Sequence, residues 1–435
     1  MRPRPRRSFI DRIHTNTEKS LSRGAVGRLL FLLAAVVLFL IAARPVLAEG
    51  SEQENDTKVT KVTPTESVDL YDTSRMPRKI RKVVFRAANY GRRGDFAKAV
   101  EILEDHLAKH PDQDHYLVQL HLAQNLADDG ATDDAYDHYQ QALALEPKLD
   151  RAWFGLADTA YELERFEVAG DAFLAGYDHS PERPVEVLYF AGVSFLSADL
   201  PEKALAVLDD LTSGRYGVPQ LSWYQALVAA AVKAGQSETA APRIAEMLEY
   251  YPDDPEAWFL KYQYHASARD FQAAAVALAI VGYMRPLSET EHQQLGDLYT
   301  VLQVPHMASR NYAAGMGEEQ TADEFERLVS SLVAAHELDE ALEVLEKVLA
   351  ADPTPRLLSL QGDIHYLRKD YEKASEAYGD LLEVDPESGR AWLMMGYCAL
   401  ELGKKEEALD NLAKASSFAD QSDMAQILMQ RALRM

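Results

Sequence analysis

Cysteine is almost absent from this sequence: Cys398 is the single one among 435 residues. One cysteine cannot form a disulfide within the chain, so a fold stapled by disulfides is excluded. Its neighbours Tyr397, Ala399 and Leu400 are apolar, which indicates a small buried side chain. Pairing with a partner's cysteine and regulation by oxidation are the alternatives.

Motifs of common catalytic and nucleotide-binding sites are also missing. The sequence has no GxxxxGK[ST], GxGxxG, HExxH or GxSxG, so nothing supports an enzyme, a catalytic residue or a cofactor. One cluster has metal-like spacing: His106 and His110 are four residues apart, with Asp112 or His115 to complete a set. Because His110 and His115 lie on either side of a helix-ending Pro111, we predict ordinary packing roles and no metal site.

Positive charge is scarce. The chain has 45 basic and 69 acidic residues and a formal net charge of −24. A surface this acidic repels nucleic acid, which is bound through basic contacts to phosphate, and it repels anionic lipid headgroups. Most of the acidic residues are expected on a solvated outer face. The charge therefore favours protein partners, including basic ones, over nucleic acid.

The N-terminus has the composition of an export signal. A basic stretch, residues 2–28, precedes an apolar run of 15 residues from Leu29 to Ala43 and small residues up to Ala48. This order of charged region, short apolar region and cleavage site predicts cleavage after Ala48. The run is shorter than the roughly 20 residues of a membrane span, but the long basic region leaves open an uncleaved inner-membrane anchor through residues 29–43.

The location and the leader follow from that segment. With residues 1–48 as export signal, the protein is expected to be periplasmic or otherwise extracytoplasmic, and to meet a membrane only through the N-terminal segment if uncleaved. Residues 49–78 are polar with few large apolar side chains, and we expect a disordered acidic leader there.

The remainder of the sequence is a repeat of about 34 residues. Bulky residues at position 4 (Trp153, Trp258, Trp392) mark its register. Units recur every 33 to 36 residues, beginning near 80, 116, 150, 185, 221, 255, 289, 322, 355 and 389. Position 20 is alanine in all ten units: Ala99, Ala135, Ala169, Ala204, Ala240, Ala274, Ala308, Ala341, Ala374 and Ala408. Position 32 is proline in seven: Pro111, Pro147, Pro181, Pro252, Pro286, Pro353 and Pro386.

Each recurring residue has a physical role in a pair of packed helices. Alanine at position 20 lets the second helix lie close against the first, and proline at position 32 ends the second helix. Gly94, Gly130, Gly235 and Gly403 lie at the turn between the helices, where positive φ is needed. Pro305 departs from the pattern, because it stands where the second helix of the seventh unit should begin.

This pattern resembles the tetratricopeptide repeat (TPR) family, whose signature is W-x2-L-G-x2-Y, then A-x3-F, then P. The resemblance covers roughly residues 80–418. It implies an all-α, right-handed superhelical solenoid of about ten TPR helix–turn–helix units over residues 79–418. Residues 419–435, with Met424, Ile427 and Leu428, are expected to form a helix that caps the open end.

The resemblance also implies a partner-binding site. In the TPR family the first helices of successive units line a concave groove, and positions 2, 5, 9 and 12 face it. An alternative for each aromatic ring is that it packs against the next unit as core. The positions that match here are Arg151, Phe154, Asp158, Tyr161, Tyr189, Val193, Phe259, Gln263, Arg356, Asp363, Tyr366, Arg390, Leu393 and Tyr397.

Position 9 departs from TPR proteins that clamp a C-terminal carboxylate with lysine and asparagine. It holds Asp158, Asp297 and Asp363, so a carboxylate clamp is not expected. A partner segment carrying Lys or Arg beside aliphatic residues fits these carboxylates better.

Two classes of function remain open. The first is a scaffold of the bacterial cell envelope that binds protein partners and no small-molecule substrate. The second is an accessory to polysaccharide export or cell-wall synthesis, with glycan in the groove. Leu, Val and Phe between the groove aromatics favour peptide. Within the first class, the stretch from Gly389 to Gln421 is similar to exported bacterial TPR proteins associated with TonB–ExbB–ExbD systems, which implies a periplasmic adaptor.

Overall fold

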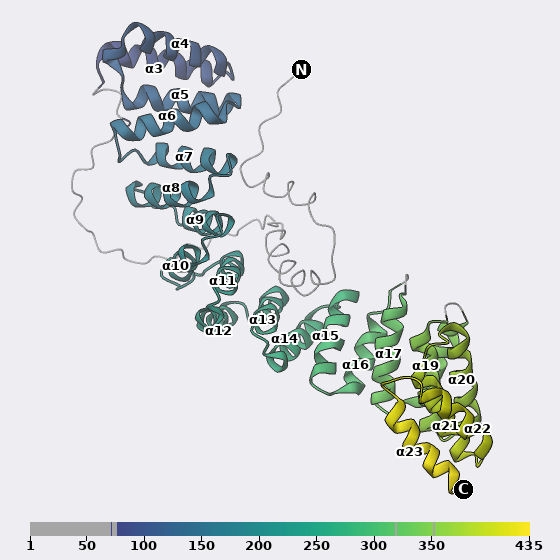
Figure 1. The fold of residues 1–435 in the computed structure, drawn as a ribbon. Helices are drawn as coiled ribbons and strands as arrows, with labels where there is room; N and C mark the ends of the chain where they lie inside the picture. Colours follow the sequence, from purple (N-terminus) through teal and green to yellow (C-terminus); the bar gives the residue numbers. More distant parts are fainter. Residues whose placement is uncertain (1–70, 72–75, 318–319, 351–352) are drawn as a thin grey trace. The chain divides into compact units, whose positions relative to one another are not determined.

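The computed structural model describes residue 71 and residues 76–317, 320–350 and 353–435. Regular structure in these ranges is helical (Figure 1). The predicted export signal and most of the predicted leader lie outside them. Among the described residues, no helix combines the length and apolar character needed to cross a bilayer.

The chain divides into two compact units, which we describe separately. Unit 1 ends at Pro252. Its described helices form consecutive pairs with two short 3-10 helices: α3 (Arg78–Gly91) with α4 (Phe96–Lys109), η2 (Pro111–Gln113), α5 (Tyr116–Asp129) with α6 (Thr132–Leu145), α7 (Asp150–Glu162) with α8 (Phe166–His179), α9 (Glu186–Ser197) with α10 (Pro201–Leu211), and α11 (Leu221–Lys233) with η3 (Ser237–Ala240) and α12 (Ala241–Tyr250).

Unit 2 begins at Asp253. Its helices also pair in sequence order, and one further helix follows the last pair: α13 (Pro255–Ser267) with α14 (Phe271–Met284), α15 (Glu289–Val301) with α16 (Pro305–Ala314), α17 (Ala322–Ala334) with α18 (Leu338–Leu349), α19 (Pro355–Leu367) with α20 (Tyr371–Val384), α21 (Gly389–Glu401) with α22 (Lys405–Ala415), and finally α23 (Ser422–Leu433).

The predicted all-α solenoid of helix–turn–helix units is confirmed. Every first helix begins within two residues of the unit start that the repeat predicts, and every second helical segment begins at position 17. The helices of the described part are consistent with the predicted number of units.

Close packing within each pair explains the invariant alanine. All ten alanines at position 20 have 0% of their surface exposed. Glycine at position 8 acts in the same way from the facing helix, because a Cβ added at Gly192, Gly296, Gly362 or Gly396 would lie within 2.7 Å of the side chain at position 24 of the same unit. Small residues on both helices therefore make room for one large residue between them.

The turn between the paired helices has one fixed conformation. Position 15 has positive φ in all ten described units, including the predicted Gly94, Gly130, Gly235 and Gly403. In the other six units a residue with a side chain adopts it: Glu164, Asp199, Arg269, Gln303, His336 and Lys369, with φ between 58° and 65°. Helix packing therefore imposes the left-handed turn even where the residue opposes it.

Prolines mark both ends of the second helices. In six of the seven units with proline at position 32, the second helix ends two residues before it. Pro305 does not disturb the seventh unit: it is the first residue of α16, as Pro201 is of α10. The first helical position needs no N–H donor, and proline's fixed φ suits it.

The last helix, α23, contacts α21 and α22. Ala425, Leu428 and Ala432 are buried in a core cluster with Leu412. Met424 and Ile427 are instead 44% and 61% exposed, so α23 covers the end of the last pair but leaves an apolar outer side.

Two glycines of one pair test the packing argument. A Cβ at Gly362 would lie 2.5 Å from the Tyr378 ring, whereas a Cβ at Gly379 of α20 meets nothing within 4 Å. We expect Gly362→Ala to lower the free energy of unfolding by about 1–3 kcal/mol through overpacking, and Gly379→Ala to raise it by about 0.5–1 kcal/mol through helix propensity. Urea unfolding followed by circular dichroism measures both, and equal effects would contradict the packing argument.

The turn makes a second stability prediction. Lys369 is exposed with φ of 65°, so Lys369→Gly should relieve left-handed strain and stabilise the protein by about 0.5–1 kcal/mol. Glu376, exposed in the middle of α20, is the control: Glu376→Gly should destabilise by about 1 kcal/mol. Opposite signs in urea unfolding are the expected result, and destabilisation by both changes would argue against strain at position 15.

Candidate functional site

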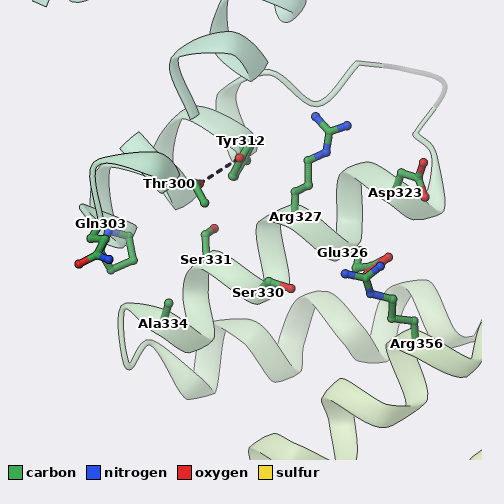
Figure 2. Close-up of a pocket in the computed structure, with 11 residues that line it drawn as sticks. Thr300, Gln303, Tyr312, Asp323, Glu326, Arg327, Ser330, Ser331, Ala334 and Arg356 are labelled. Atoms are coloured by element: carbon green, nitrogen blue, oxygen red, sulfur yellow. Dashed lines mark hydrogen bonds and ion pairs between the residues drawn. The ribbon is translucent and has the colours of Figure 1, made fainter. Parts of the chain in front are cut away.

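A cavity of about 620 Å³ lies within unit 2, between the helices α15, α16, α17 and α19 (Figure 2). Two acidic and two basic residues are among those that line it, with hydroxyl side chains between them. The lining residues are Thr300, Gln303, Pro305, Tyr312, Asp323, Glu326, Arg327, Ser330, Ser331, Ala334 and Arg356.

The cavity lies at groove positions of the repeat. Asp323, Glu326 and Ser330 are positions 2, 5 and 9 of the unit that begins at 322, and Arg356 is position 2 of the next. The first helices α17 and α19 that carry them contact each other. Only Arg356 belongs to the predicted groove set. The other three were missed, although the same register applied to the eighth unit identifies them.

Hydrogen bonds organise the wall that α15 and α16 form. The Tyr312 hydroxyl donates to Asp297 Oδ1 at 2.8 Å and lies 3.1 Å from Thr300 Oγ1. Burial and the bond to Asp297 raise the pKa of Tyr312 to about 12, so the phenol stays protonated at neutral pH. Arg327 Nη1 lies 3.6 Å from the same Asp297 oxygen. This wall is therefore held in place before any ligand arrives.

A second ion pair crosses from α17 to α19. Figure 2 shows the carboxylate of Glu326 against the guanidinium of Arg356, and the two form a salt bridge. The Glu326 side chain is 14% exposed and that of Arg356 is 78% exposed. A ligand can therefore reach Arg356 from solvent, and it would meet paired charges of both signs beside the exposed hydroxyl of Ser330.

Asp363 and Arg390, both predicted groove residues, lie together in the next units. Arg390 Nη2 donates to both Asp363 oxygens at 2.9 Å, and the Tyr378 hydroxyl donates to Asp363 Oδ1 at 2.6 Å. Arg390 Nη1 also donates to Ser359 Oγ at 2.6 Å. The sequence predicted that a Lys or Arg of a partner would pair with Asp363. Arg390, from the next unit of this chain, occupies that place instead.

The predicted aromatic residues of the last units also meet. The rings of Tyr366 and Tyr397 pack edge to face with centroids 6.3 Å apart, and the Tyr397 hydroxyl lies 3.6 Å from Met424 Sδ of α23. Both tyrosines are half-buried, while the predicted Leu393 is buried at 7% exposure. Each of the two tyrosines is therefore only partly open to solvent.

In the sixth unit the predicted residues lie closer to the core. Gln263 is buried at 9% exposure. Phe259 is half-buried, with its ring 5.4 Å from that of Tyr262 and 5.8 Å from the Arg285 guanidinium. Tyr262 fills position 8, where seven of the other nine units have glycine or alanine.

In unit 1, Arg151 has a contact that the repeat did not predict. Its guanidinium lies over the Tyr71 ring, 4.1 Å from the centroid, and its backbone N–H donates to the Tyr71 hydroxyl at 3.1 Å. The same hydroxyl bonds the Asp150 carboxylate. Tyr71, which precedes α3, thus lies at the start of α7 beside an exposed groove residue.

The other predicted residues of unit 1 lie on α7 and α9. Phe154 is half-buried and packs on α8, where a Cβ at Gly176 would be 2.4 Å from its ring. Tyr161 meets the Phe166 ring edge to face at 5.0 Å. Burial and the nearby Tyr161 raise the pKa of Tyr189, and Val193 is half-buried.

Asp158 differs from the other two aspartates at position 9. Within the described residues no cation pairs with its carboxylate, and the side chain is exposed. Surrounding protein atoms, and secondarily Glu162, raise its pKa to about 6. Because solvent reaches the carboxylate, water limits the size of this shift but not its direction. An incoming Lys or Arg would stabilise the ionised form.

The histidine cluster and the cysteine have packing roles. His106 is 8% exposed, and its ring lies 5.3 Å from that of His110. His115 is turned to cap α5, with Nδ1 accepting from the Leu117 N–H at 3.2 Å. Cys398 has 0% of its surface exposed, and burial raises the pKa of its thiol to about 12. Nowhere in the described ranges are three or more His, Cys, Asp or Glu side chains grouped to hold a metal ion.

Comparison with protein families identifies the repeat. A tetratricopeptide repeat model matches residues 120–184 and 226–281. These stretches are therefore similar to tetratricopeptide repeats. A model described as anaphase-promoting complex, cyclosome, subunit 3 matches residues 334–415, which contain the α19–α22 part of unit 2. Comparison with the curated proteins gives no match.

Solved structures with similar helical arrangements are distant in sequence. This chain is 14% identical to the structure of Naa15/Naa10 bound to HypK-THB, with 80% of this chain and 64% of that chain covered and a TM-score of 0.47. It thus spans less than two thirds of that chain. It is 15% identical to a tetratricopeptide repeat protein from Parabacteroides merdae (59% and 100% covered, TM-score 0.34) and 10% identical to yeast Tom70 (81% and 94% covered, TM-score 0.31).

Asp158 gives a pH-dependent prediction. A pKa raised above the ordinary carboxyl value of 3.8 means that the folded protein binds the proton more tightly than the unfolded chain, so this group's contribution to stability falls as pH rises from about 4 to about 6. Asp158→Asn removes the ionisable group, and with it the loss of stability that ionisation causes. We expect the variant to be more stable than the native protein at pH 7 and equal to it at pH 4, measured by urea unfolding. A deficit at pH 7 would show that the ionised carboxylate stabilises the fold.

Proposed function

We propose that this TPR chain is a non-enzymatic scaffold of the bacterial cell envelope that binds segments of partner proteins along its first helices. The observation that carries the proposal is the cavity of about 620 Å³ in unit 2. It lies at repeat positions assigned to the groove on other grounds, and its side chains offer hydrogen bonds and charge rather than an apolar surface alone.

The chemistry of the partner follows from which charges are already paired. In unit 2, Asp297, Glu326 and Asp363 each have an arginine of this chain beside them. A partner there gains most by hydrogen bonds to the exposed Ser330 and Arg356. In unit 1, the unpaired Asp158 is free to accept a Lys or Arg. The partner segment we propose is therefore polar, with a basic residue opposite α7.

Peptide is a better fit than glycan for the same surface. Sugar rings stack on exposed aromatic faces, whereas Tyr366 and Tyr397 pack against each other and Tyr161 packs against Phe166. The envelope location in this proposal rests on the N-terminal segment before residue 49. A role as periplasmic adaptor of a TonB-type energy-transducing system rests on the likeness of the stretch from Gly389 to Gln421.

Crosslinking in living cells tests the proposal. A photoreactive residue is placed at Ser330 in the cavity and at Tyr161 in unit 1, with Glu376 on α20, a second helix, as the control position. We expect Ser330 and Tyr161 to capture an envelope protein and Glu376 to capture none. Asp158→Lys should reduce capture from Tyr161 by about tenfold, because it places like charges opposite each other.

Other outcomes would overturn parts of the proposal. Capture of glycan or of a polysaccharide synthase from Ser330 would exclude the peptide function. Capture from Glu376 alone would show that the working surface is formed by the second helices. Capture of a TonB, ExbB or ExbD protein from either groove position would identify the transport system, and capture of cytoplasmic proteins would exclude the envelope.

A further inference from the structure

One face of unit 1 has the opposite charge to the rest of the chain. Arg78, Lys79, Lys82 and Arg86 are exposed on α3, and Arg93 is exposed in the turn after it. Phe85 lies among them and is 65% exposed. Residues 78, 79, 82, 85 and 86 recur at intervals of three, four or seven residues along α3, so they share one side of the helix, and Arg93 follows in the turn beyond Gly91. We call these six residues the basic face.

The cations of the basic face lack the partners that cations find elsewhere in this acidic protein. Lys203, Lys233, Arg243 and Arg431 each form a salt bridge with Asp or Glu. For the five cations of the basic face, no salt bridge occurs with any described residue. Glu101 and Asp105 of α4 line a hollow together with Lys82 and Arg86, but both carboxylates are already engaged within α4, Glu101 by Lys98 and Asp105 by Lys109.

Helix stability does not account for this arrangement. Arg78, Lys79 and Arg81 occupy the first turn of α3, which has no acidic residue and no side-chain cap. The N-terminal end of a helix carries partial positive charge, so cations there are unfavourable. An exposed phenylalanine among them adds a further cost in water. Such a surface is favourable only against something that is both anionic and apolar.

The surface beside α3 has room for such a ligand. A hollow of about 360 Å³ is lined by Arg78, Arg81, Lys82, Phe85 and His121, together with Val84 and Ala88, and none of these is acidic. Burial and the nearby Arg151 lower the pKa of His121, so it adds a hydrogen-bonding imidazole rather than a further charge at neutral pH.

We propose that the basic face of α3 docks on the surface of a bilayer that contains anionic phospholipid. The five cations would contact headgroup phosphates, and Phe85 would enter the boundary between headgroups and acyl chains. The overall charge of −24 does not prevent this, because charges more than about 10 Å from the bilayer are screened at physiological salt. The inference is independent of what the groove binds.

Position in the chain supports a bilayer as the occupant. The apolar run that ends at Ala43 precedes Arg78 by 35 residues. If that run stays in a membrane, α3 is the first described helix after it, and 35 residues can reach from the membrane to α3 without being fully extended. In that case the basic face adds a second, weaker membrane contact to the anchor, a combination that gives stable attachment.

Fluorescence of the full-length protein tests the proposal. Asn89→Cys, on the same side of α3, is labelled with the environment-sensitive dye NBD. Cys398 does not compete, because it is fully buried and the pKa of its thiol is raised. The labelled protein is reconstituted in vesicles of phosphatidylcholine alone, or of phosphatidylcholine with phosphatidylglycerol. We expect a blue shift and an increase of about threefold in emission with phosphatidylglycerol, which high salt reverses.

Charge-reversed variants decide the interpretation. Lys82→Glu/Arg86→Glu should abolish the increase, whereas Lys347→Glu/Lys369→Glu, which reverses two exposed and unpaired cations of unit 2, should leave it unchanged. Phe85→Ser keeps every charge and should remove most of the increase in emission. This variant tests the proposal independently if Lys82→Glu/Arg86→Glu folds poorly. Equal emission in both vesicles would overturn the proposal. Blue-shifted emission without lipid, lost in the first variant, would instead show that an acidic protein segment covers the face.

Discussion

The close approach of two helices within each pair is the constraint on which the rest of the structure depends. Neither helix of a pair has enough apolar surface to form a core alone. Alanine at position 20 and, in seven of the ten units, glycine or alanine at position 8 bring the backbones together, and the side chain at position 24 fills the space that remains. The geometry of that one contact then determines the left-handed turn between the two helices, where the second helix ends, and which side of the first helix faces a ligand.

Sequence reasoning located the helices well because this contact recurs in local sequence. Each alanine at position 20 lies a fixed number of residues from its turn and from the start of the second helical segment, so the register could be read without knowing the neighbours. The same reasoning treated Pro305 as an irregularity, since it considered only what proline removes and not the first helical position that suits it. It also found glycine at four turns but could not see that six residues with side chains adopt the same left-handed conformation.

The candidate site was predictable in position but not in its interactions. The groove register places Asp323, Glu326 and Ser330 beside Arg356, and it would have identified the cavity if applied to every unit. It could not show that Arg390, 27 residues further along, neutralises Asp363, or that Tyr71 reaches Arg151 from 80 residues away. Such contacts depend on side-chain conformations and on the spacing of neighbouring units. Whether a groove carboxylate is free or engaged is therefore decided by tertiary structure.

The cluster around Asp363 links three helices of unit 2. Tyr378 connects this carboxylate to α20, and Arg390 connects it to α21 of the following pair. The same oxygen atoms thus hold one pair together and join it to the next. A ligand that drew Arg390 away would loosen the joint between neighbouring pairs, so occupancy of the groove and the bending stiffness of the solenoid are mechanically coupled at this point. In such an architecture a binding event can be transmitted as a change in elasticity, without any helix having to unfold.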